Sequence, residues 1–332
     1  MARDRDAAIE VSRDDMEEHP AVLAWGQLQP SRVEPESLQV LRKRTKASVY
    51  RLGGVGPGGS SVIAKRSRSP AAAIERTIYE AVLPRLGVTS PRYYGSREDD
   101  GDYCWLFIED VGARRYSVSN PEHSALAGRW LGRMHASAAR VGEAARLGEV
   151  LPDGGPGCYL EHLRTGRRSI LRNLSNPALT AADVEVLDAV VFVQDRLEAE
   201  WNRVEEACAG MPHTLVHGDF RPKNAYLRHD TSGLQLFPID WEMAGWGVPA
   251  ADLTRVSLAA YGDVVREDWP DLDAASLRRQ AMLGRVFGLL AAIAWESLSL
   301  KYDTRRFLLK PTTSMRIYRD ELSNAIQAAE LA

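Results

Sequence analysis

The sequence has few of the features that mark secreted, membrane-spanning or nucleic-acid-binding proteins. Its three cysteines, Cys104, Cys158 and Cys208, are too widely spaced for a metal-ligand pattern and are typical of a reducing compartment. The charged N-terminal stretch has no apolar signal region, and the longest apolar run, VFGLLAAIAW, is too short to cross a membrane. The net charge of −3 gives no overall attraction to nucleic acid or anionic lipid. We therefore expect a cytoplasmic protein with no nucleic-acid or membrane partner.

Lysine is also scarce. Only six of the 42 basic residues are Lys, so 36 are Arg. A lysine at a motif position therefore carries more weight here than in an average chain. Lys65 is the only lysine between Lys46 and Lys223.

The length of 332 residues and the hydrophobic content of 45% predict two lobes. Strand-like runs followed by mostly helical ones predict class α+β. Residues 1–37 are interpreted as an N-terminal extension with one short helix, PAVLAWGQL. Residues 38–109 are expected to form a small, mainly antiparallel β lobe with one helix that begins after Pro70. Residues 110–332 are expected to form a larger, mostly helical lobe, which includes a long helix capped by Thr180 and a β-hairpin.

Glycine-rich segments in the first lobe suggest a nucleotide site only weakly. GGVGPGG has the G-x-G-x-x-G spacing of a dinucleotide-binding loop, but that loop must open a helix, and here a strand is predicted to follow. We interpret it as a hairpin turn. A phosphate-covering loop is expected instead at KRTKAS, between the first two strands, with Ser48 and backbone N–H groups facing the phosphates.

The most informative polar cluster is HGDFRPKN, which directly follows an apolar run. Phosphoryl transfer needs a carboxylate to accept the proton of the attacking hydroxyl, and oxygen ligands to hold Mg²⁺. Asp219 and Asn224 lie on this one loop, and Asp240 closes the next strand of the predicted hairpin. Arg221 follows Asp219 by two residues, where its charge could meet the transferring phosphoryl group.

HGDFRPKN, followed by IDWE and then PAADL, resembles the motifs of the aminoglycoside phosphotransferase and choline kinase family. The resemblance extends over about residues 38–320 and implies a two-lobed, protein-kinase-like fold that binds ATP or GTP between its lobes. It implies that His217 braces the loop, that Asp219 is the catalytic base and that Asp252 is a structural brace. Asn224 and Asp240 would bind Mg²⁺. Arg221 stands where many members carry His.

The strand SVIAK matches the kinase strand whose lysine holds nucleotide phosphates, and it places Lys65 at that position. The lysine needs a carboxylate partner on the next helix. Helical projection places Glu75 on the apolar stripe of that helix and Glu80 on the opposite side, so Glu75 is the predicted partner. WLFIEDVG is predicted to link the lobes, with backbone atoms of Glu109 and Val111 facing the purine.

The acceptor is not fixed by the motifs. We expect a small hydroxylated acceptor, either an antibiotic or other natural product, or a cellular metabolite such as a sugar, a choline-like alcohol or an amino alcohol. A protein kinase is disfavoured, because only eleven residues separate Asp240 from Asp252. A silent nucleotide-binding module is disfavoured, because it would not need Lys65, Asp219, Asn224 and Asp240 together. The sequence does not predict an oligomeric state.

Overall fold

The computed structural model describes residues 9–28, 34–44, 46–140 and 144–331. The chain forms two compact units, which are each described separately. The first contains residues 1–117 and 221–243, and the second contains 118–220 and 244–332. In this division the segment up to residue 117 and the hairpin that follows residue 220 both belong to the first unit, and the lobe boundaries at residues 37 and 109 stay a prediction.

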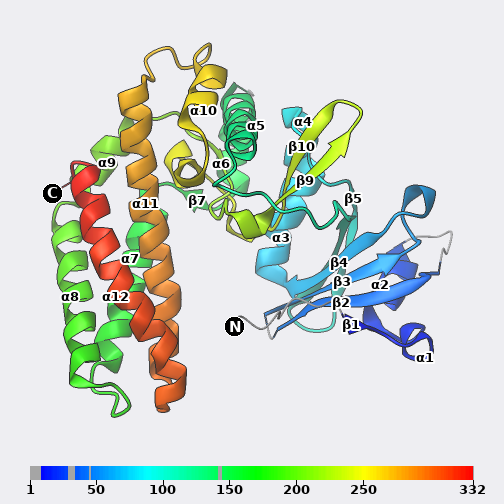
Figure 1. The fold of residues 1–332 in the computed structure, drawn as a ribbon, viewed down its shortest axis with the longest axis horizontal. Coiled ribbons are helices and arrows are strands. Elements are labelled where there is room, and N and C mark those ends of the chain that lie inside the picture. Colours follow the sequence, from blue (N-terminus) through cyan, green and yellow to red (C-terminus); the bar gives the residue numbers. More distant parts are fainter. Residues whose placement is uncertain (1–8, 29–33, 45, 141–143, 332) are drawn as a thin grey trace. The chain divides into compact units, whose positions relative to one another are not determined.

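The first unit is built on a six-stranded sheet with the order β1-β2-β3-β4-β6-β5, in which all neighbouring strands are antiparallel (Figure 1). The predicted strands are confirmed as β2 Ser37–Lys43, β3 Ala47–Gly53, β4 Val62–Arg68, β5 Tyr93–Asp99 and β6 Tyr103–Glu109. β1, Ile9–Glu10, lies in the predicted extension and was not predicted. The GGVGPGG segment connects β3 to β4, with Gly54 at φ 81°, and no helix of the dinucleotide-binding type follows it.

The predicted helix after Pro70 is present but has three parts. α3 spans Ser69–Thr77, a π-helical turn spans Ile78–Val82, and α4 spans Leu83–Leu86. Gly87 ends the last part with φ 63°, the left-handed conformation that favours glycine at a helix C-terminus. The π turn was not predicted, since a helical repeat in the sequence does not distinguish i,i+4 from i,i+5 hydrogen bonding.

The N-terminal segment packs on this sheet. α1 spans Arg13–Met16, and α2 spans Pro20–Leu28, the predicted PAVLAWGQL helix. Trp25 is 4% exposed, and its ring lies 5.4 Å from that of Phe107 on β6 and 5.8 Å from that of Tyr94 on β5. The described part of the segment therefore supplies core residues to the first unit.

Trp25→Ala should lower the free energy of unfolding by about 3–5 kcal/mol, because it empties a buried aromatic site. Leu23 lies on the same helix and is 49% exposed, so Leu23→Ala should change stability by only about 0.5 kcal/mol. Denaturant titration of both variants checks the difference. Equal effects would show that Trp25 does not anchor the segment.

The predicted hairpin consists of β9, Ala225–Asp230, and β10, Gly233–Pro238. It belongs to the first unit through hydrogen bonds with the segment after β6. The N–H of Tyr116 donates to the Ala225 carbonyl at 3.0 Å, and Arg228 pairs with Glu109 at 2.6 Å. These contacts join the hairpin to residues 109–116, which are distant from it in the sequence.

The second unit is mostly helical, with one small sheet of order β7-β11-β8. The strands are β7 Asp153–Gly154, β8 Thr214–Val216 and β11 Gly245–Gly247. The helices are α5 Pro121–Arg140, α6 Ala144–Val150, α7 Pro156–Asn173, α8 Ala181–Ala199, α9 Trp201–Ala209, α10 Leu258–Val265, α11 Ala274–Ser297 and α12 Arg305–Ala328. The predicted capping box of Thr180 and Asp183 is present, but the helix that follows divides into α8 and α9 at Glu200.

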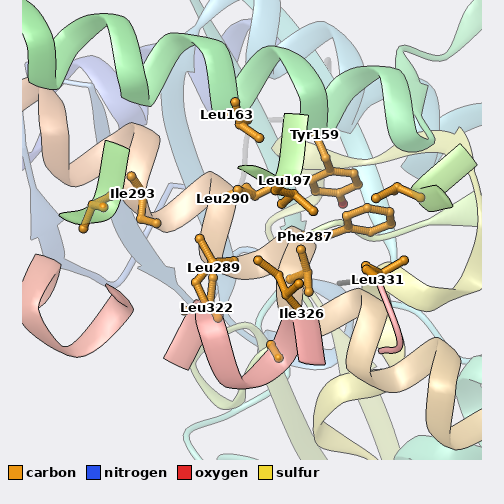
Figure 2. Packing of buried hydrophobic residues seen from close by; sticks show 14 of the residues in the cluster. Tyr159, Leu163, Leu197, Phe287, Leu289, Leu290, Ile293, Leu322, Ile326 and Leu331 are labelled. Carbon is orange, nitrogen blue, oxygen red and sulfur yellow. The ribbon is translucent and has the colours of Figure 1, made fainter. Parts of the chain in front are cut away.

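The core of this unit lies among α7, α8, α11 and α12. Its residues include Leu163, Leu290, Ile293 and Leu322, and the rings of Tyr159 and Phe287 are parallel with centroids 4.0 Å apart (Figure 2). Among the described segments, only 274–301, which is α11 with the turn after it, is long and apolar enough to pass as a membrane span by length and composition. α11 supplies much of this core, and 56% of its most apolar window is buried.

Candidate active site

The HGD motif begins where β8 ends, and it is held by a buried aspartate. The backbone N–H groups of His217 and Gly218 donate to the two carboxylate oxygens of Asp252 at 2.7 and 3.0 Å. Asp252 is fully buried, and its Oδ2 lies 3.4 Å from Nε2 of His135. Nδ1 of His135 in turn lies 3.0 Å from the Tyr261 hydroxyl. Asp252 therefore fixes the path of the loop through its backbone.

Asp219 lies between two buried residues of this loop. His217 is fully buried and Phe220 is 3% exposed, whereas Asp219 is half-buried. The Phe220 ring stacks on Trp130 at 6.5 Å and meets the His217 ring edge-on at 5.9 Å. The loop is thus anchored on both sides of Asp219, which itself is only half-buried.

The first unit contains a buried cluster of one lysine and two carboxylates. Lys65 lies on β4, and its Nζ is 2.5 Å from Oε1 of Glu75 on α3. Lys65 also forms an ion pair with the carboxylate of Asp240. The side chain of Lys65 is 11% exposed, that of Glu75 2% and that of Asp240 18%. Glu75 is buried and Glu80 is exposed, as the apolar stripe of the helix predicted.

Burial and mutual attraction set the charges of this cluster. Burial lowers the pKa of Lys65, but the charges of Glu75 and Asp240 outweigh it, so the pKa lies above its ordinary value. Burial raises the pKa of Glu75 to about 7, against the opposing effect of Lys65 and with a further contribution from Asp240. Burial also disfavours ionised Asp240, but the positive charges of Lys65 and Lys223 hold its pKa below the usual range.

Asn224 and Asp240 are brought together by the hairpin. Asn224 directly precedes β9, Asp240 follows β10, and the N–H of Ile239 donates to the Asn224 carbonyl at 2.8 Å. Asn224 is 4% exposed. Asp240 has φ 68°, a conformation that non-glycine residues adopt mainly at turns and functional sites.

These oxygen donors fit Mg²⁺ better than a metal that needs a complete protein cage. Mg²⁺ commonly binds through one or two side-chain oxygens and completes its shell with water and phosphate oxygens. Among the residues that the structure describes, no group of three or more His, Cys, Asp or Glu side chains is arranged around a metal position. One amide oxygen and one carboxylate suit a metal that arrives with a nucleotide.

The remaining predicted nucleotide contacts, Ser48, Glu109 and Val111, are not part of this charged cluster. Ser48 lies within β3 opposite Lys43 and Arg66, while Thr45 of the predicted phosphate loop lies outside the described residues. The N–H of Glu109 donates to the Arg92 carbonyl at 2.8 Å. Val111 is buried.

Two further residues near the cluster were missed by sequence reasoning. Tyr79 lies one helical turn after Glu75, and its pKa is raised well above normal by burial and by the charges of Glu75 and Asp240. Lys223 lies in the quoted motif and acts electrostatically on Asp240. The scarcity of lysine could have indicated Lys223, whereas Tyr79 had no comparable signal.

A lysine on an antiparallel sheet, held by a helix glutamate, together with an anchored HGD loop, defines a protein-kinase-like phosphotransferase. The model of the phosphotransferase enzyme family matches residues 37–293. The chain therefore belongs to the phosphotransferase enzyme family and is a small-molecule kinase by class.

Solved structures share its fold at low sequence identity. APH(2")-IIia in complex with GDP and kanamycin matches with a TM-score of 0.62 and 12% identity over 91% of this chain and 98% of that one. The microcompartment-associated aminopropanol kinase matches with a TM-score of 0.59 and 17% identity over 89% and 94%. Choline kinase from Cryptosporidium parvum matches with a TM-score of 0.60 and 9% identity over 92% and 94%. No curated protein sequence matches the chain.

Glu75→Gln should reduce kcat/KM for the nucleotide by an amount equivalent to about 1–3 kcal/mol, because it removes a charge-assisted hydrogen bond to Lys65. Glu80→Gln is the matched control and should stay within about 0.5 kcal/mol of wild type. Steady-state kinetics of both variants checks the ranking. The reverse order would show that Lys65 is not oriented by Glu75.

The pH profiles of the wild type and of Glu75→Gln give a second test of the role of Glu75. The pKa of Glu75 is about 7, so its negative charge is progressively lost as the pH falls below that value. Wild-type kcat/KM should therefore decline from pH 8 to about pH 6, and Glu75→Gln should lack this decline because its amide does not titrate. A parallel decline in both proteins would assign it to another group.

Proposed function

We propose that the protein is an ATP- or GTP-dependent and Mg²⁺-dependent O-phosphotransferase. It transfers the γ-phosphoryl group to a hydroxyl of an antibiotic or other natural product, as a resistance or self-protection enzyme would. The buried pairing of Lys65 with Glu75 and Asp240 carries the proposal. One lysine and two carboxylates leave an excess negative charge in a buried cluster, and such perturbed clusters are common at functional sites. A lysine with two carboxylates suits phosphates with their metal.

Each part of the site has a role in this proposal. Lys65, oriented by Glu75, binds nucleotide phosphates, and backbone atoms of Glu109 and Val111 face the purine. Ser48, the last residue of the predicted phosphate loop and the second of β3, would face the phosphates. Asn224 and Asp240 would hold Mg²⁺, which when bound supplies positive charge to the phosphate oxygens.

The chemical step is assigned to the loop that begins at His217. Asp219 accepts the proton of the acceptor hydroxyl as that oxygen bonds to the γ-phosphorus and the bond to the β-phosphate oxygen breaks. Arg221 is placed two residues later, where its charge would offset the charge on the transferring group. His217 and Asp252 act by positioning the loop.

A cellular metabolite is the second candidate acceptor. The matches to an aminopropanol kinase and a choline kinase favour it, since they have TM-scores and coverage similar to those of the antibiotic kinase. An amino alcohol or choline-like compound would present one hydroxyl to Asp219.

Nucleoside diphosphate release should be measured with ATP and with GTP against a panel of both acceptor types. The panel should contain aminoglycosides and other hydroxylated antibiotics, choline, aminopropanol, ethanolamine and sugars. Asp219→Asn is the control for each active compound. Growth of cells that express the protein in the presence of antibiotics tests the first candidate directly. Nucleotide binding without transfer to any acceptor, and without resistance, would favour a silent binding module.

A further inference from the structure

The second unit carries an exposed aromatic and basic segment that the proposed reaction does not use. We call residues 295–310 the aromatic–basic turn; it contains the end of α11, the turn after it and the start of α12. Five of its large apolar side chains are partly exposed, Trp295 42%, Leu298 48%, Tyr302 46%, Phe307 58% and Leu309 52%, whereas Leu300 and Leu308 are buried in the core of the second unit. Such concentration within fifteen residues is unusual, because exposed apolar side chains are normally scattered singly.

The charge of this segment is opposite to that of the whole chain. Residues 295–310 contain four basic side chains and two acidic ones, which gives a net charge of +2 against −3 for the protein. Its two lysines, Lys301 and Lys310, are the only lysines after Lys223. Lys310 pairs with Glu296 at 2.5 Å, and Arg305 pairs at 2.5 Å with the buried Asp183, which lies outside the segment. Lys301, Arg306 and Asp303 then leave the segment with a net charge of +1.

The aromatic–basic turn has a defined conformation. The Asn176 side chain donates to the carbonyls of Leu300 and Tyr302 at 2.7 and 2.9 Å. The rings of Tyr302 and Phe307 are 5.5 Å apart, and the ammonium of Lys301 lies 5.7 Å from the Tyr302 ring centroid. Tyr302 and Phe307 are therefore ordered before any partner binds, which reduces the entropy lost on binding.

We propose that the aromatic–basic turn docks this protein on an anionic lipid surface. Trp and Tyr favour the headgroup region of a bilayer, Phe and Leu enter its apolar boundary, and Lys and Arg are attracted to anionic lipid. The turn lies at one end of the α7, α8, α11 and α12 bundle, where α11 ends and α12 begins (Figure 1). The negative charge of the rest of the chain makes this docking weak and sensitive to salt.

A lipid surface fits these observations better than a protein partner. A stable protein interface usually involves about 20–30 residues on each side, whereas this segment has sixteen. A flat lipid surface needs no matching groove. The composition of the whole chain predicted no membrane partner because the net charge averages over this local excess.

Cosedimentation of the full-length protein with vesicles tests the proposal. Binding is expected to vesicles of equimolar phosphatidylcholine and phosphatidylglycerol at low salt, and little binding to phosphatidylcholine alone or at high salt. Phe307→Ser and Lys301→Glu should each reduce the partition coefficient by about tenfold. Phe192→Ser is the matched control, since Phe192 is 62% exposed on α8 between Asp188 and Asp195 and should leave binding unchanged.

Three results would overturn the proposal. The first is absence of binding to the mixed vesicles by folded wild-type protein. The second is binding that neither Phe307→Ser nor Lys301→Glu reduces. The third is self-association in sedimentation velocity that Phe307→Ser abolishes, without vesicle binding, because the turn would then be a contact between copies of this chain. Circular dichroism and nucleotide turnover confirm that each variant is folded.

Discussion

Asp219→Asn is expected to lower kcat by about 10²–10⁴, the range for loss of a general base, while nucleotide binding stays nearly unchanged. The substitution preserves the shape of the side chain and removes its capacity to accept a proton. The loop should keep its path, because Asp252 holds it through the N–H groups of His217 and Gly218. Steady-state kinetics with the best acceptor, together with nucleotide titration, measures both quantities.

A purely structural role for Asp219 predicts a different pattern. An aspartate that only caps the loop would affect thermal stability more than kcat when replaced. Asp252→Asn supplies that comparison, since Asp252 is fully buried and accepts two backbone hydrogen bonds. It should lower stability clearly, by about 1–3 kcal/mol. Near-wild-type kcat in Asp219→Asn would remove Asp219 from the role of base.

Features that depend on local sequence were predicted well. Short β-rich runs placed the strands of the first sheet, and Pro70 and Gly87 marked the ends of a helical segment. Helical projection alone separated Glu75 from Glu80, because burial of an apolar stripe fixes the rotation of a helix on a sheet. The inward direction of Glu75 followed from that rotation.

Features that depend on contacts distant in sequence were not predicted. The described N-terminal segment joins the core of the first unit through Trp25, and the β9–β10 hairpin joins the same unit through bonds to residues near 115. The pattern of residues in each segment does not show which distant residues it contacts. The π turn beside Tyr79 and the left-handed backbone of Asp240 likewise depend on their surroundings.

The pairing of Lys65 with Asp240 also could not be derived from spacing, because 175 residues separate the two side chains. The motifs assigned Lys65 to phosphates and Asp240 to the metal. In the structure they contact each other, and Asp240 contributes to the raised pKa of Glu75. A substitution at Asp240 should therefore alter the electrostatics of Lys65 and Glu75 as well.

Asp240→Asn is expected to abolish Mg²⁺-dependent nucleotide binding while the fold survives. The substitution removes the carboxylate of the proposed metal pair, and Mg²⁺ strongly favours charged oxygen donors. Asn tolerates the φ of 68° at this position, so it tests the charge without the backbone strain that Ala would add. Nucleotide titrations with and without Mg²⁺ measure the effect, and thermal denaturation confirms the fold.

The same variant distinguishes a metal ligand from a simple partner of Lys65. Loss of Asp240 leaves Lys65 paired with Glu75 alone, and the pKa of Glu75 should fall because one of the charges that raises it has gone. If Asp240 only neutralised Lys65, nucleotide phosphates would bind more tightly in Asp240→Asn, with or without Mg²⁺. If Asp240 holds the metal, affinity without Mg²⁺ should change little and the gain on adding Mg²⁺ should disappear. An unchanged response to Mg²⁺ would exclude Asp240 from the metal site and leave Asn224 without its proposed partner.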